Sequence, residues 1–169
     1  MKRVLNWIFI GAALIFMQSF LLDRIAFSYY IFPMIYPLLL LIMPFKMSKW
    51  GLMFLGFGIG LIMDILSNTG GMHASAMLVL AFFRNNTIRL LEPPIGYGED
   101  NVPGINNPGV QWFFFYSFML LFLHHLVFFS WEIFSLNRII FILFKTIFST
   151  FFSVFIIMLL SFLFKPSEK

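Results

Sequence analysis

Long apolar stretches separated by short polar breaks are the dominant pattern of this 169-residue chain. A bilayer core of about 30 Å demands about 20 apolar residues from a straight helix, and shorter stretches suffice where neighbouring helices shield them. The pattern therefore predicts an all-α integral membrane protein of one domain with six membrane-spanning helices. Their approximate ranges are 4–22, 29–45, 50–66, 72–83, 110–129 and 139–164. The first stretch is long and lacks a small-residue cleavage site, which favours a retained span over a signal peptide.

Two of the predicted spans are irregular. The second contains Pro33, Pro37 and Pro44, so we expect it to be kinked or partly unwound, with its freed carbonyls satisfied by other helices. The fourth has only about a dozen residues, and a re-entrant segment is the alternative there. Residues 84–109 are rich in proline, glycine and asparagine, which predicts the one sizeable loop outside the membrane.

The positive charges indicate the orientation. With six spans, one side receives eight basic residues and the other receives two, while Lys145 lies within the last span. The eight are Lys2, Arg3, Lys46, Lys49, Arg84, Arg89, Lys165 and Lys169, and the two are Arg24 and Arg138. Because basic residues concentrate in cytoplasmic loops, this bias predicts that both termini and the 84–109 loop are cytoplasmic.

Composition narrows the function classes. Hydrophobic residues make up 61% of the chain and charged residues only 11%, which excludes an ordinary soluble domain. His124 and His125 are adjacent without a His-Glu-x-x-His pattern, and Gly96 and Gly98 lack the rest of a phosphate-binding motif. We therefore expect no enzyme activity, no cofactor, no metal and no nucleic-acid partner.

A face of small residues marks the third predicted span. Gly56, Gly60 and Asp64 recur every four residues, so on a helix they share one face. Small residues at this spacing allow close approach of another helix. That helix belongs either to the same bundle or to a partner chain, and the spacing alone leaves both open.

Ionisable residues inside the predicted spans or just beyond their ends gather toward the side opposite the termini. Charges in a bilayer are expensive, so each of them calls for a partner or a function. The set comprises Asp64, His73, His124, His125, Glu132 and Lys145. One hypothesis pairs Asp64 with Lys145 or a histidine in a buried polar cluster. In the alternative, Lys145 extends toward the interface and Asp64 caps the turn at Asn68 and Thr69.

Residues 60–67 (GLIMDILS), 71–74 (GMHA) and 76–77 (AM) resemble the central signature of the MreD family of bacterial rod-shape-determining membrane proteins. The resemblance implies a multi-pass protein of the bacterial inner membrane whose bundle is similar to the S-components of vitamin transporters. It also implies a non-enzymatic scaffold that maintains cell shape during peptidoglycan synthesis. Such a scaffold binds MreC, a single-span protein, and connects MreB filaments with the glycosyltransferase RodA and its transpeptidase partner.

A second function class stays open at this point. A substrate-binding subunit of a small-molecule transporter would share the bundle and would use the polar cluster to hold a solute. The two classes differ in one observable feature. The transporter subunit requires a ligand-sized, polar-lined cavity open to the outside, and the scaffold requires a membrane partner.

Overall fold

The computed structural model describes residues 2–25, 31–94, 96–97 and 102–163, and 76% of these residues are helical. No β-strand occurs within those ranges. The long helices are α1 (Lys2–Phe20), α3 (Lys49–Ser67), α4 (Met72–Leu90), α5 (Val110–Ile133) and α6 (Ile139–Leu163). The short ones are η1 (Leu22–Arg24), α2 (Leu38–Leu41) and η2 (Leu136–Arg138). The all-helical prediction is confirmed.

Within the part of the chain that the structure describes, four helices are long and apolar enough to cross a membrane. They cover Leu5–Arg24, Lys49–Ser67, Val110–Ile133 and Ile139–Leu163. This is the pattern of a multi-pass membrane protein. The six-span count, with additional crossings by α4 and the segment before α3, stays a prediction.

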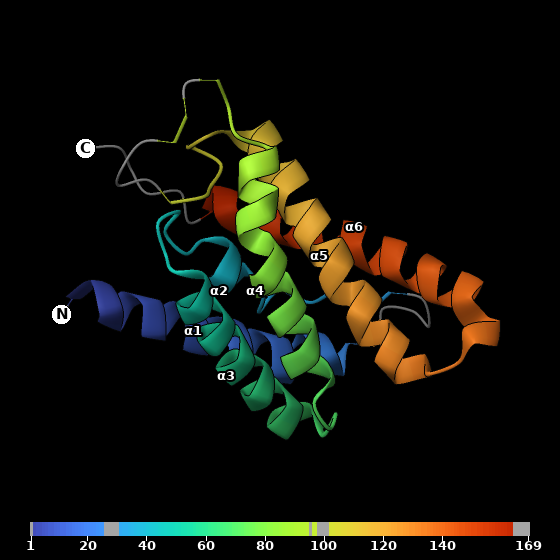
Figure 1. Ribbon diagram of the computed structural model, residues 1–169. Helices are drawn as coiled ribbons and strands as arrows, with labels where there is room; N and C mark the ends of the chain where they lie inside the picture. The colour runs from blue at the N-terminus through green and yellow to red at the C-terminus, as the bar shows by residue number, and fades with distance from the viewer. Residues whose placement is uncertain (1, 26–30, 95, 98–101, 164–169) are drawn as a thin grey trace.

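Helices α3 and α4 form a tight antiparallel hairpin, with α5 packed on the other side of α4 and α6 packed on α5 (Figure 1). The hairpin follows from local sequence. The Ser48 hydroxyl accepts a hydrogen bond of 3.1 Å from the Gly51 N–H and caps the start of α3. At the other end Asn68 adopts a left-handed conformation, which closes α3 before a glycine-containing turn leads into α4.

Helix α4 corrects the predicted end of the fourth span and the start of the loop. It continues through Arg84 to Leu90, seven residues beyond the predicted end at residue 83. The polar residues there remain helical because no proline occurs between Arg84 and Pro93. The Thr87 hydroxyl finds its partner within the helix, at the Phe83 carbonyl. At 19 residues α4 is as long as α3.

The rest of the predicted loop folds back onto the bundle through aromatic residues. Tyr97 stacks on Phe45 with ring centroids 4.3 Å apart, and its hydroxyl donates to the Ile88 carbonyl at 2.7 Å. Burial raises the pKa of the Tyr97 hydroxyl above its ordinary value. The Trp112 indole donates to the Leu91 carbonyl at 2.8 Å, which ties the end of α4 to the start of α5.

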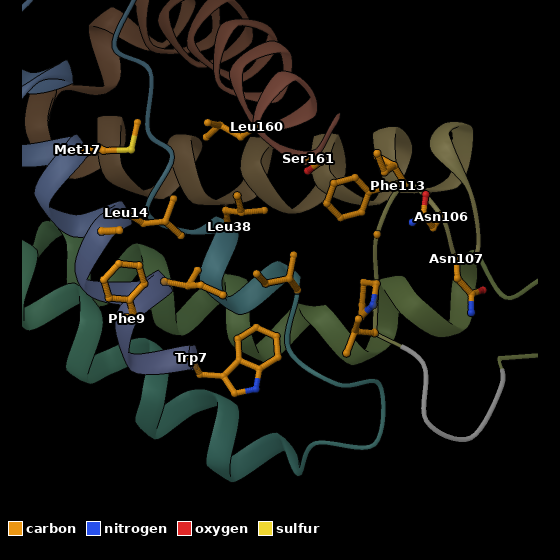
Figure 2. Close-up of a pocket in the computed structure, with 17 residues that line it drawn as sticks. Trp7, Phe9, Leu14, Met17, Leu38, Asn106, Asn107, Phe113, Leu160 and Ser161 are labelled. Carbon is orange, nitrogen blue, oxygen red and sulfur yellow. The ribbon is translucent and has the colours of Figure 1, made fainter. Parts of the chain in front are cut away.

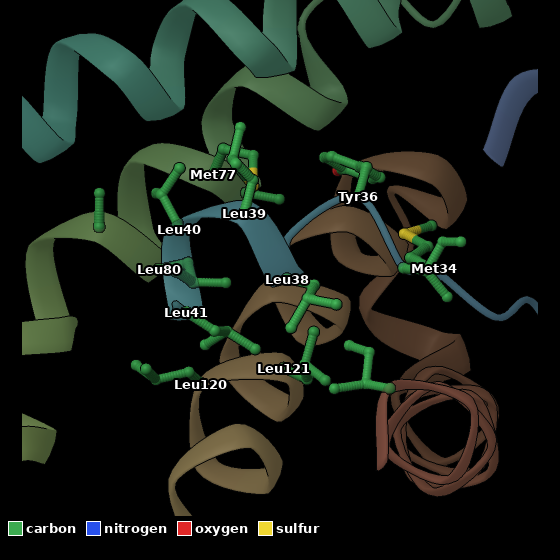
Figure 3. Packing of buried hydrophobic residues seen from close by; sticks show 14 of the residues in the cluster. Met34, Tyr36, Leu38, Leu39, Leu40, Leu41, Met77, Leu80, Leu120 and Leu121 are labelled. Carbon is green, nitrogen blue, oxygen red and sulfur yellow. The ribbon is translucent and has the colours of Figure 1, made fainter. Parts of the chain in front are cut away.

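The proline-bearing segment lies at the centre of the molecule and is mostly not helical. Among the described residues of this segment, the only helical turn is α2, whose four leucines are buried. Around that turn pack Met77 and Leu80 of α4 and Leu120 and Leu121 of α5 (Figure 3). The three prolines thus correctly indicate an interrupted helix, and the segment forms the middle of the hydrophobic core.

Candidate functional site

The glycine face of α3 packs against α4 within the same chain. A Cβ atom added at Gly60 would lie 2.7 Å from the Ala74 backbone nitrogen and 2.8 Å from the His73 carbonyl oxygen. One at Gly56 would lie 3.2 Å from the Met77 carbonyl oxygen. Of the two interpretations of this face, the structure therefore shows packing inside the bundle. Gly58 points elsewhere, with no atom within 4 Å of its hypothetical Cβ.

Asp64 holds the start of α4. Its carboxylate accepts hydrogen bonds from the backbone N–H groups of His73 at 3.0 Å and Ala74 at 2.9 Å, and from the Thr69 hydroxyl at 2.6 Å. These are the backbone donors that a helix leaves unpaired in its first turn. A negative charge is also favourable at the positive end of the helix dipole. The last residue of the α3 face therefore caps α4 from outside that helix.

The predicted pairing of Asp64 with Lys145 or with a histidine side chain is wrong. The Lys145 ammonium lies 2.6 Å from the Glu132 carboxylate, and Asp64 accepts from the His73 backbone rather than its ring. The Lys145 side chain is buried, and its charge also lies 4.6 Å from the centre of the Phe129 ring. Two separate arrangements thus satisfy these charges, because Asp64 has closer partners in the turn that follows it.

The histidines that the sequence places in one cluster do come together, around Tyr36. The Tyr36 hydroxyl lies 2.9 Å from His73 Nδ1 and 2.7 Å from His124 Nε2, and all three side chains are buried. A hydroxyl carries one proton, so Tyr36 donates to one ring and accepts from the other. His124 Nδ1 has no partner within the described part of the chain, which favours the tautomer with its proton on Nε2. Tyr36 then donates to His73.

His125 belongs to a neighbouring contact that anchors the non-helical segment. Its Nε2 atom lies 3.2 Å from the Ser153 hydroxyl, which itself accepts from the Met34 N–H at 2.8 Å. One turn earlier on α6, the Ser149 hydroxyl accepts from the Phe32 N–H at 2.9 Å. A serine pair four residues apart on α6 therefore supplies the acceptors that a missing helix would have supplied.

The other helices complete this backbone. On α1 the buried Gln18 amide donates to the Pro33 carbonyl at 3.1 Å and accepts from the Ile35 N–H at 2.7 Å. At the far end the Tyr116 hydroxyl donates to the Leu41 carbonyl at 3.0 Å, and the Arg84 guanidinium donates to the Met43 carbonyl. The freed backbone groups are thus satisfied by side chains of α1, α4, α5 and α6.

Sequence reasoning missed several of these residues. Arg84 was assigned to a cytoplasmic loop, yet its side chain is completely buried. The sequence does not predict Gln18, Ser149 and Ser153 as site residues, because single polar residues in apolar helices are common. A usable signal existed: polar residues at i and i+4 on otherwise apolar helices, next to a proline-broken span, mark the donors and acceptors that such a span requires.

Comparison with known proteins identifies no relative. No family model, curated protein or solved structure matches this chain. Within the described residues, no three histidine, aspartate or glutamate side chains gather closely enough to hold a metal ion. The polar side chains described above bond one another or the backbone, so their geometry is that of contacts that hold the helices together.

A groove of about 590 Å³ lies between α1 and the last turns of α6 (Figure 2). Its walls come from α1, the α2 region, the first turn of α5, the last turns of α6 and residues 102–107. Most of the lining side chains are apolar, including Leu14, Met17, Leu38 and Phe113. This groove does not have the polar lining that a solute site would need, and the polar cluster around Tyr36 does not line it.

Proposed function

We propose that this chain is a non-enzymatic scaffold of the bacterial cell-wall elongation machinery, with six spans in the inner membrane and both termini in the cytoplasm. In this role it binds an MreC-like single-span protein and thereby links MreB filaments to RodA and its transpeptidase partner. The proposal rests on the resemblance of residues 60–77 to the MreD signature and on what those residues do in the fold.

One observation carries the proposal. The residues of the resemblance that face α4 pack in one interface, in which Gly60 lets α3 touch the backbone of α4 and Asp64 caps α4. Ala74, Ala76 and Met77 are buried in the same interface. A signature made of packing and capping residues specifies a shape rather than a reaction, and this suits a scaffold.

The state of the polar cluster favours the scaffold over a transporter subunit. Tyr36 and His124 are completely buried and His73 is only 4% exposed, and the Tyr36 hydroxyl bonds both histidine rings. A solute site needs polar groups that face an open cavity. Here these groups already serve to join the central segment to α4 and α5.

Crosslinking in native membranes followed by pull-down tests the proposal. We expect a single-span MreC-like protein to be captured by the wild-type chain. Recovery of an energy-coupling ATPase module in its place would reject the scaffold role and support the transporter subunit.

A matched pair of variants links this capture to the fold. Gly60→Leu should abolish capture together with correct folding, because leucine cannot fit against the α4 backbone. Gly58→Leu adds the same side chain where no atom lies within 4 Å, so it should fold normally. Wild-type capture and cell shape with Gly60→Leu would remove the glycine face from the argument.

A further inference from the structure

The groove between α1 and α6 has one polar end. Figure 2 places Leu14 and Met17 toward one end and Asn106 and Asn107 toward the other. Neither asparagine side chain has a hydrogen-bonding partner among the described residues, although the Asn107 carbonyl accepts from the Gly104 N–H. The groove therefore combines a long apolar wall with free amide groups at its mouth. An amphiphile has the same division into an apolar and a hydrogen-bonding part.

The groove is open along one side, and about 590 Å³ is room for only about five residues of an α-helix about 10 Å across, so a spanning helix could lie across its mouth but not within it. A methylene group occupies about as much space as a water molecule in the liquid, about 30 Å³, so the groove has room for at least one hydrocarbon chain of roughly 20 methylene groups. That is the size of one phospholipid acyl chain.

We propose that this groove is a built-in binding site for one phospholipid, one of whose two acyl chains lies along α1 in the groove and whose ester and phosphate region meets Asn106 and Asn107. Phe9, on the groove wall, is 76% exposed, which leaves the site open sideways to the bilayer. Amide side chains supply both donors and acceptors, and these match ester carbonyls and phosphate oxygens.

The lipid would fill a gap that the chain leaves unfilled. Between α1 and α6 runs the non-helical segment, which bonds Gln18 of α1 and the serines of α6. An acyl chain in the groove makes the van der Waals contacts with the apolar walls that an empty space would lack. The lipid is thereby a structural element that holds α1 against the bundle.

Native mass spectrometry of the full chain purified in detergent tests the site. We expect the wild type to retain one phospholipid per chain. Ala13→Phe places a ring in the groove, where Ala13 is part of the wall, and should retain none. Ile62→Phe adds a similar ring on the exposed face of α3 and should retain one, as the wild type does.

Thermal unfolding provides a second readout. Removal of lipid should lower the Tm of the wild type and of Ile62→Phe, and added phosphatidylglycerol vesicles should restore it. Ala13→Phe should not respond, because its own ring takes the place of the chain. If Ala13→Phe fails to fold, Asn106→Leu combined with Asn107→Leu decides, since neither side chain is bonded to another described residue, and the double variant should reduce lipid retention several-fold.

Three results would overturn the proposal: a wild type that retains no phospholipid, equal retention by the groove variants, or a polypeptide crosslinked within the groove in place of lipid. The scaffold role is tested separately, because these measurements use the purified chain without any MreC-like partner.

Discussion

Gly60 has the least room for an added methyl group among the described glycines, and its neighbours are backbone atoms. In Gly60→Ala the new Cβ would start 2.7 Å from the Ala74 nitrogen, whereas an ordinary contact begins at 3.4 Å. Because the Ala74 Cα atom lies nearer still, helices α3 and α4 must separate by at least about 0.7 Å. The same movement would stretch the 2.9 Å bond between Asp64 and the Ala74 N–H beyond hydrogen-bonding distance.

The two effects add. Forcing an extra methyl group into a packed interface costs about 1–3 kcal/mol, and loss of a helix cap costs about 1 kcal/mol. Alanine returns about 0.5–1 kcal/mol because glycine is a poor helix former. We expect the free energy of unfolding to fall by about 1–3 kcal/mol, measured by SDS titration of the detergent-solubilised protein with circular dichroism as the readout.

Gly58→Ala is the matched control. It makes the same chemical change two residues away on the same helix, where nothing lies within 4 Å, so only the helix-forming gain applies. Its stability should equal or slightly exceed that of the wild type. If Gly60→Ala were as stable as Gly58→Ala, the close approach of α3 and α4 would not be a structural requirement.

Three further predictions concern the buried polar contacts and use the same unfolding assay. Asp64→Asn should lower stability by about 1–2 kcal/mol, because the amide puts N–H groups where two backbone donors need an acceptor; an unchanged value would refute its capping role. Glu132→Gln should lower the free energy of unfolding by about 1–3 kcal/mol, and Lys145→Met by less than about 1 kcal/mol. Glu132→Gln leaves the buried Lys145 without its charged partner, whereas Lys145→Met leaves the Glu132 side chain, which is 38% exposed and can be solvated by water. The reverse order would contradict this reasoning. Tyr36→Phe should cost about 1–3 kcal/mol, since both bridged rings lose their partner, and a neutral effect would show that the bridge contributes nothing.

Local sequence patterns were sufficient where the physical cause was itself local. The apolar stretches predicted the long helices, since bilayer thickness and helix rise together set their length. Pro33, Pro37 and Pro44 predicted an interrupted segment, because proline removes backbone donors wherever it occurs. The predicted end of α4 is seven residues too early, because an arginine after an apolar stretch predicts a loop. In the fold Arg84 lies inside α4, where its buried guanidinium bonds the Met43 carbonyl.

The sequence alone does not determine which polar residues pair with one another. Asp64 and Lys145 were the obvious pair by charge, yet each had a nearer partner once the turn after α3 and the crossing of α5 and α6 were formed. Tyr36 was invisible as a site residue, since its role depends on two histidines that lie 37 and 88 positions away.

The sequence by itself thus determined a helical membrane protein, the spacing that brings Gly56, Gly60 and Asp64 onto one face, and the break in the second segment. These features depend on helix geometry and on the transfer of apolar side chains into lipid. Both are set by residues within a few helical turns of one another. Only the tertiary structure decided that the glycine face is covered by α4, which groups satisfy the broken segment, and that a groove remains between α1 and α6. Those outcomes depend on distances between segments far apart in the chain, and a hydrogen bond is made or lost within about 1 Å.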